Sequence, residues 1–344
     1  CDTGRMRQVS IVMNRNATRM ACLVALAACG VLPTLAAQPD PLVLEARISL
    51  GDVRGRIDHL AIDIARQRLL VAELGNGSVG VVDLKRAKLL RTITGFGEPQ
   101  GVGFEDATDT LYVADGADGA VRLFHGADLA PAGQLTLGDD ADNVRVDGAG
   151  RRVLVGYGSG ALAVINAGSR PKIASIPLRA HPEGFQLDHA GQMVYINVPD
   201  ANEIAVVDLA TGQQAARWTT SGLSANFPMA IDEARRRVLV GFRHPATLGV
   251  FDLQSGALLN RVAVCGDVDD VFVDSRRDRV YVSCGEGFVD VLAAEGGTYV
   301  RAARIATAAG ARTALYSPDI DRLLLAVRAT ATTPAAVWVF RPAP

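Results

Sequence analysis

The chain has 344 residues, with 35 Lys and Arg against 37 Asp and Glu, so its formal net charge is −2 at pH 7. Nucleic-acid-binding domains need a concentrated basic surface, and this balance therefore disfavours a nucleic-acid partner. Aromatic residues make up only 5% of the chain while glycine occurs 35 times, which is typical of short strands joined by tight turns.

Residues 1–40 have the pattern of an export signal. Arg15 and Arg19 precede an apolar run at residues 20–28, and small residues follow at 34–37. The run is too short to predict a transmembrane helix. Two processing routes are open. Residues 26–29 resemble a bacterial lipoprotein box, which would leave a lipid anchor on Cys29, whereas cleavage after Ala36 or Ala37 would release a soluble protein. Either route predicts a periplasmic or secreted location.

Residues 41–344 contain seven repeats of a short apolar strand that ends in an anchor residue. The anchors follow one another at spacings of 41 to 44 residues and are Asp63, Glu105, Asp147, Asp188, Asp232, Asp274 and Ser317. Strand repeats of this length predict an all-β fold, a seven-bladed β-propeller that occupies residues 41–344 as one domain. The anchors themselves are expected to be structural.

Each repeat divides into four strands. In the first repeat we expect them at residues 60–63, 68–72, 78–83 and 89–93, separated by turn signals such as Gly75-Asn76-Gly77-Ser78. The seventh repeat stops after residues 337–340 without a fourth strand. Residues 42–50 precede the first repeat and can supply it. The N-terminal strand is therefore predicted to complete the last blade and close the ring.

Several strand motifs resemble the YVTN-type seven-bladed propeller family of secreted bacterial proteins. They are Leu111-Tyr112-Val113-Ala114-Asp115, Val280-Tyr281-Val282-Ser283, and residues 204–209 followed by Ala210-Thr211-Gly212. The resemblance covers about residues 41–344. It implies the same propeller fold and a secreted protein, and it implies no particular activity.

Polar residues precede the first strand of most repeats. Five places before the anchors stand Asp58, Gln100, Asp142, Glu183, Phe227, Asp269 and Arg312. Seven places before them stand Arg56, Glu98, Asp140, His181, Ala225, Asp267 and Gly310. Because the ring relates these loops, we expect them to converge on one mouth of the central channel. The residues predicted to bind a small ligand there are Asp58, Gln100, Asn143, Glu183, Asn226 (in place of its neighbour Phe227), Arg243, His244 and Arg312.

So many carboxylates at one mouth repel each other, and a bound cation is a usual remedy. Glu98, Asp142, Asp269 and Asp270 are the predicted metal ligands. Calcium or magnesium suits oxygen ligands, whereas zinc would prefer His59 and His181. The alternative for each aspartate is a structural role, in which it caps loop amides and holds a turn.

Cys265 and Cys284 are the only cysteines beyond the export signal. In an oxidising compartment a disulfide between them is the first expectation. Two separate buried thiols or a thiolate metal site are the alternatives.

Two functions fit the predicted mouth. The first is binding of a small ligand or a divalent metal ion without reaction. The second is a metal-dependent hydrolase or lyase, similar to propeller lactonases and streptogramin lyases, with His59 or His181 as the general acid/base. Whether the protein is an enzyme is left open, and a scaffold for protein partners is a third reading that only the fold supports. No organic cofactor is predicted, because the chain has no Cys-x-x-Cys-His haem motif and no dinucleotide loop leading into a helix.

Overall fold

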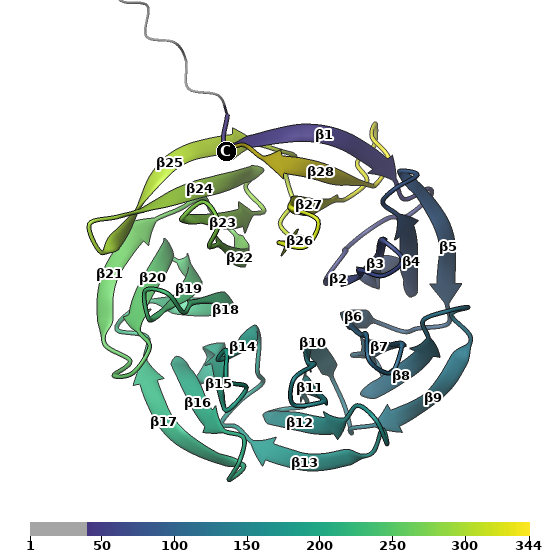
Figure 1. Ribbon diagram of the computed structural model, residues 1–344, viewed down its shortest axis with the longest axis horizontal. Coiled ribbons are helices and arrows are strands. Elements are labelled where there is room, and N and C mark those ends of the chain that lie inside the picture. The colour runs from purple at the N-terminus through teal and green to yellow at the C-terminus, as the bar shows by residue number, and fades with distance from the viewer. Residues whose placement is uncertain (1–39) are drawn as a thin grey trace, which may run out of the picture. The chain divides into compact units, whose positions relative to one another are not determined.

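The computed structural model describes residues 40–344 as seven four-stranded antiparallel sheets arranged in a ring (Figure 1). The predicted all-β, seven-bladed propeller is therefore confirmed. The predicted export signal, with the lipid-attachment site at Cys29, lies outside the described residues. In residues 40–344, no helix has the length and apolar character needed to cross a membrane.

Each blade runs from an inner strand at the channel to an outer strand at the rim. Blade 1 comprises β2 (Leu60–Asp63), β3 (Arg68–Glu73), β4 (Ser78–Asp83) and β5 (Lys88–Thr94). Blade 2 comprises β6 (Pro99–Glu105), β7 (Thr110–Asp115), β8 (Ala120–His125) and β9 (Pro131–Thr136). Blade 3 comprises β10 (Ala141–Asp147), β11 (Arg152–Tyr157), β12 (Ala161–Asn166) and β13 (Lys172–Pro177).

The remaining blades follow the same order around the ring. Blade 4 comprises β14 (Phe185–Leu187), β15 (Met193–Val198), β16 (Glu203–Asp208) and β17 (Gln213–Thr219). Blade 5 comprises β18 (Ser224–Asp232), β19 (Arg237–His244), β20 (Ala246–Asp252) and β21 (Leu258–Ala263). Blade 6 comprises β22 (Val268–Asp274), β23 (Arg279–Cys284), β24 (Phe288–Glu295) and β25 (Thr298–Ala306). Short 3-10 helices, η1 (Leu74–Asn76) and η2 (Pro199–Ala201), join second to third strands in blades 1 and 4.

Blade 7 joins the two ends of the described chain. It contains β26 (Ala314–Ser317), β27 (Arg322–Val327) and β28 (Ala336–Pro342), and its outer strand is β1 (Leu42–Ser49). Figure 1 shows β1 lying along β28 at the rim. The two strands pair antiparallel from Leu42 opposite Pro342 to Ser49 opposite Ala336. This pairing is the closure that the sequence predicts, and it covers the edge that β28 would otherwise expose.

The core is divided among the junctions between blades. Seven clusters of buried apolar side chains occupy the seven junctions, so each blade packs on both faces. This explains the almost continuous burial of middle strands such as β4, all six of whose residues are buried. The rigid ring that results holds the loops at the channel mouth in fixed positions.

Anchor aspartates at the opposite end of the channel link neighbouring blades through arginines. Arg277 pairs with the anchor Asp274 of its own blade at 2.9 Å and with Asp321 of blade 7 at 2.7 Å. Arg66 joins Asp63 to Asp109, and Arg235 joins Asp232 to Asp278, in the same way. Asp63, Asp232 and Asp274 therefore have the structural role that the repetition of the anchors predicts.

Candidate functional site

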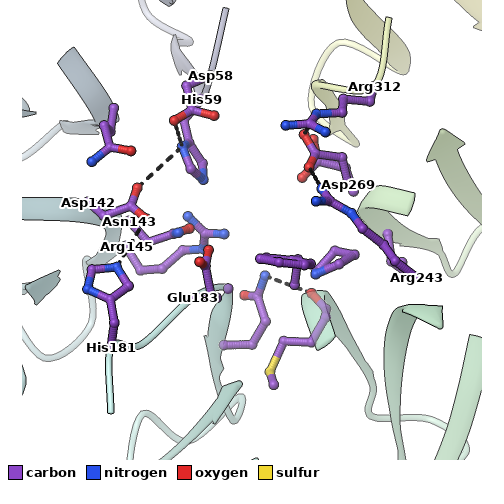
Figure 2. A pocket seen from close by; sticks show the side chains of 18 of the residues that line it. Asp58, His59, Asp142, Asn143, Arg145, His181, Glu183, Arg243, Asp269 and Arg312 are labelled. Atoms are coloured by element: carbon purple, nitrogen blue, oxygen red, sulfur yellow. Dashed lines mark hydrogen bonds and ion pairs between the residues drawn. The ribbon is translucent and has the colours of Figure 1, made fainter. Parts of the chain in front are cut away.

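A cavity of about 270 Å³ opens at the mouth of the channel, where the loops before the inner strands meet. We call these the leading loops. Figure 2 shows the labelled side chains that line the cavity, which come from several blades. The polar and charged members of the lining are Arg56, Asp58, His59, Gln100, Asp140, Asp142, Asn143, Arg145, His181, Glu183, Gln186, Arg243, Asp269, Asp270 and Arg312.

The leading loops are held by the same backbone contact in several blades. A glycine in the turn between the second and third strands donates its N–H to the residue seven places before the anchor. Gly75 donates to Arg56 O, Gly116 to Glu98 O and Gly285 to Asp267 O, each at 2.8 Å. Asp140 and Asp267 adopt φ of 42° and 57°, a left-handed conformation that aspartate tolerates better than most residues. These two aspartates therefore shape their loops as well as carrying charge.

An irregular start to the inner strand directs two consecutive side chains into the cavity. The pairing of β10 with β11 shifts register between Ala141 and Val144, so Asp142 and Asn143 lie within a bulge. The pairing of β22 shifts in the same way between Val268 and Asp270. A bulge re-aims side chains that would otherwise alternate between the two faces of the sheet. Both residues of the β10 bulge consequently line the cavity.

Asp142 lies between the two histidines of the site. Its Oδ1 is 4.0 Å from His59 Nδ1, and its Oδ2 is 3.6 Å from His181 Nε2. Asp58 joins the first histidine and Glu183 the second, giving two three-residue groups whose potential ligand atoms lie within 4.8 Å of one another. Figure 2 shows Asp142, His59 and His181 around one side of the cavity. These carboxylate and imidazole groups could hold a metal ion.

Three buried polar atoms in this region have no hydrogen-bond partner within residues 40–344. They are His59 Nδ1, Asp142 Oδ1 and Asn143 Oδ1. Asp142 is only 6% exposed and Asn143 only 2%, so water cannot readily satisfy these atoms. A buried polar atom without a partner costs on the order of 1–3 kcal/mol. All three atoms carry lone pairs that can bind a metal ion, and the residues present therefore fit one.

The other imidazole is oriented by the backbone. His181 Nδ1 lies 2.6 Å from Gly158 O and donates to it, which leaves Nε2 directed at Asp142. A second-shell contact of this kind is common for histidines that bind metal. Burial lowers the pKa of His181, but Asp142 and the Gly158 carbonyl outweigh that effect and raise the pKa to about 9. Without a metal ion, His181 is therefore protonated at neutral pH and forms an ion pair with Asp142.

Glu183, on the same side of the cavity as His181, also has a strongly shifted pKa. Burial and the neighbouring charge of Asp142 raise the pKa of Glu183 to about 8. Burial likewise raises the pKa of Asp270, and the charge of Asp269 adds to the increase. The cavity therefore combines an ionised carboxylate at Asp142, whose pKa is lowered, against the effect of burial, by the neighbouring histidines, with the carboxyl group of Glu183, which holds its proton near neutrality.

The opposite side of the cavity is a network of ion pairs. Asp269 accepts from Arg243 at 2.5 Å and lies 3.3 Å from Arg312 Nε. Arg243 also stacks over the ring of Phe227, with its guanidinium carbon 4.0 Å from the ring centroid. Figure 2 shows Arg243, Asp269 and Arg312 facing the Asp142 side across the cavity. Because its oxygens are already used by two arginines, Asp269 is poorly placed to serve as a metal ligand.

The structure brings together most of the residues predicted for ligand, metal or catalysis. Those that line the cavity are Asp58, His59, Gln100, Asp142, Asn143, His181, Glu183, Arg243, Asp269, Asp270 and Arg312. Glu98 and His244 are exposed and lie outside the lining. Asn226 is fully buried and donates to Asn197 Oδ1 and Glu203 O, so it supports the wall, while Phe227 lines the cavity in its place.

Cys265 and Cys284 form a disulfide at the start of blade 6. Both residues are fully buried. The bridge ties the leading loop of blade 6, which carries Asp267 and precedes Asp269 and Asp270 of β22, to the end of β23.

Arg145 lines the cavity but is not among the site residues predicted from the sequence. It stands two places before its anchor, at a position where the other blades have Ala61, Gly103, Gln186, Ala230, Phe272 and Leu315. A charged residue at a position otherwise filled mainly by small or apolar side chains is the signal that could have identified it. Gln186 deviates in the same way and also lines the cavity.

Comparisons with known proteins identify the fold and no family. No family model matches the sequence, and no curated protein does. The chain is similar to a structure of Kuenenia stuttgartiensis hydrazine synthase, with 15% identity and a TM-score of 0.73 over 83% of this chain and 95% of the other. It is also similar to a chain in a crystal structure of the mitotic checkpoint complex, with 13% identity and a TM-score of 0.72 over 95% and 99%. The likeness is one of fold.

Proposed function

We propose that the protein binds a divalent metal ion at Asp142 and a small polar ligand in the cavity beside it. One observation carries this proposal. The carboxylate of Asp142 lies between His59 and His181, and both its Oδ1 and His59 Nδ1 are buried without a hydrogen-bond partner in the described residues. A bound cation would satisfy both atoms and would reduce the repulsion between Asp142 and its carboxylate neighbours.

The donor set favours a transition metal. Calcium and magnesium prefer shells made entirely of oxygen, whereas zinc and other first-row metals accept imidazole nitrogen together with carboxylate oxygen. Each three-residue group at this site contains one histidine and two carboxylates. We therefore propose zinc or manganese ahead of calcium or magnesium.

The location proposed for the protein is the periplasm or the exterior of the cell. The pattern of residues 1–40 supports it, and so does the resemblance of the strand motifs to YVTN-type propellers. The disulfide between Cys265 and Cys284 also suits an oxidising compartment.

Metal titration of the chelator-treated protein tests the proposal. Isothermal calorimetry with zinc and with manganese is expected to show stoichiometric binding to the wild type and at least a hundredfold weaker binding to Asp142→Asn. Asp200→Asn, at an exposed position on η2, is the matched control and should bind as the wild type does. Equal affinity in the wild type and Asp142→Asn would refute the proposal.

A metal-dependent hydrolase or lyase is the second candidate, and the environment of Glu183 favours it. A buried carboxyl group in a cavity, with a pKa of about 8 in the metal-free protein, is suited to transfer protons near neutral pH. A metal ion at Asp142 would supply Lewis-acid polarisation of a substrate carbonyl. If this candidate is correct and the metal ion is held by Asp58, His59 and Asp142, Glu183→Gln should abolish turnover of a lactone while retaining the bound metal. Absence of turnover across lactone and lyase substrates would leave binding as the function.

A further inference from the structure

Four arginines line the cavity, and three of them are neutralised by neighbouring carboxylates. Arg56 contacts Asp58 at 2.8 Å. Arg243 and Arg312 each pair with both Asp267 and Asp269. The fourth is Arg145, which has no carboxylate oxygen within 4.0 Å in residues 40–344.

The guanidinium of Arg145 has few partners of any kind. Its one hydrogen bond within the described chain runs from Nη1 to Val144 O at 2.9 Å. The guanidinium also lies over the ring of Phe185, with its carbon 5.6 Å from the ring centroid. A guanidinium has five N–H donors and stays ionised in proteins. Arg145 therefore brings a full positive charge and unused donors into the cavity.

Arg145 comes from the same strand as Asp142 and Asn143. Figure 2 shows it on the side of the cavity that also carries Asp142 and Glu183. A ligand that contacts Arg145 would thus lie next to the proposed metal site. The volume of about 270 Å³ is slightly below the range typical of drug-sized ligands, which restricts the occupant to a small molecule.

We infer that the ligand is a small monocarboxylate whose carboxylate group binds Arg145, with a hydroxyl or keto oxygen beside it for the metal ion. A planar carboxylate matches the fork of a guanidinium and accepts two parallel hydrogen bonds. One unpaired guanidinium compensates one negative charge. The lining also carries ionised carboxylates, Asp142 among them, and these oppose a more highly charged anion such as phosphate.

The part of this inference that concerns the hydroxyl or keto oxygen rests on the proposed metal site. The part that concerns the carboxylate and Arg145 stands without it, since it depends only on an unpaired charge inside a cavity. The experiment must therefore separate the two parts.

The test is calorimetric binding of lactate and pyruvate to the zinc-loaded and to the chelator-treated protein. Lactamide, which replaces the carboxylate of lactate by a neutral amide, is the matched ligand control. Lactate and pyruvate are expected to bind at millimolar concentration or below, and lactamide at least tenfold more weakly. In Arg145→Met the affinity for lactate should fall at least tenfold, while Arg145→Lys, which keeps the charge and loses the fork, should give an intermediate value.

Arg86→Met is the matched protein control, because Arg86 is 72% exposed and lies outside the lining. It should bind lactate as the wild type does. Equal binding of lactate and lactamide would overturn the inference. So would unchanged lactate affinity in both Arg145 variants, or no binding of either acid to the wild type. Lactate binding that depends on Arg145 in a protein that takes up no metal would support Arg145 as the receptor and refute the metal proposal alone.

Discussion

His181 presents Nε2 to Asp142 Oδ2 at 3.6 Å while its Nδ1 is engaged by the carbonyl of Gly158. The backbone thus fixes which nitrogen faces the cavity. Either a proton or a metal ion can lie between His181 Nε2 and Asp142 Oδ2. The two cannot be bound there at the same time.

Replacing Asp142 and replacing Asp269 by asparagine should affect metal affinity and melting temperature differently. Asp142→Asn removes the charge shared by both candidate ligand groups and is expected to abolish metal uptake with the fold intact. Asp269→Asn instead disturbs the pairs with Arg243 and Arg312, so its metal affinity should stay within about threefold of the wild type while its melting temperature falls. Metal titration and thermal melting of both variants check this. Loss of metal binding in Asp269→Asn alone would reverse the assignment.

Stability of the metal-free protein should fall as pH rises. The folded state keeps protons on Glu183 up to about pH 8 and on His181 up to about pH 9, whereas the unfolded chain releases them near 4.5 and 6.5. The folded state therefore binds more protons between pH 4.5 and 9, and the free energy of unfolding declines across that window. Melting curves of chelator-treated protein from pH 4.5 to 9 should show the decline.

Glu183→Gln provides the control for this pH dependence. The amide resembles the protonated carboxyl group, so the variant should lose the part of the decline between pH 4.5 and 8 and keep the part due to His181. Saturating zinc should also flatten the alkaline part, because the metal ion replaces the proton on Nε2. Identical pH profiles for the wild type and Glu183→Gln would show that Glu183 is not perturbed by burial.

The arginine that links blades 6 and 7 should contribute measurably to stability. Arg277→Ala leaves the fully buried Asp274 without its ion pair and is expected to lower the free energy of unfolding by about 1–3 kcal/mol. Arg86→Ala is the matched control, since Arg86 also follows its aspartate by three residues but is exposed and contacts one carboxylate only. Urea unfolding of the two variants makes the comparison. An equal loss in both would show that the link between blades adds nothing.

The disulfide should stabilise the fold and the leading loop of blade 6. Its cysteines are separated by 19 residues, and closing a loop of this length contributes about 3 kcal/mol in the chain-entropy account. Replacing both cysteines by alanine should therefore lower the free energy of unfolding by about that amount. Hydrogen exchange of residues 266–270 should accelerate in the variant. Unchanged stability and exchange would show that blade packing alone holds the loop.

The repeat pattern of the sequence predicts the ring and most of the cavity. Anchors spaced by 41 to 44 residues place the blades in register, and counting back from them identifies Asp58, Asp142, Glu183 and Asp269 as neighbours. This works because the leading loops of several blades are held by the same backbone contact, so equivalent positions meet at the mouth.

The details that depend on local backbone irregularity could not be predicted in this way. The pairing of β18 with β19 shifts register between Asn226 and Met229, which directs Asn226 into the wall and Phe227 into the cavity. Arg145 lies in the regularly paired part of β10, after the bulge, so a search of the loops alone passes over it. Which aspartate is free for a metal ion also depends on ion pairs between blades, such as those of Asp269, that no spacing reveals.

The most direct measurement of the central claim is anomalous X-ray diffraction from crystals of the zinc-loaded protein at the zinc absorption edge. We predict one strong peak in the cavity, about 2.0–2.2 Å from a carboxylate oxygen of Asp142 and from a nitrogen of His59 or His181. The peak should be absent from crystals of Asp142→Asn. A peak located elsewhere, or no peak in the wild type, would contradict the metal site.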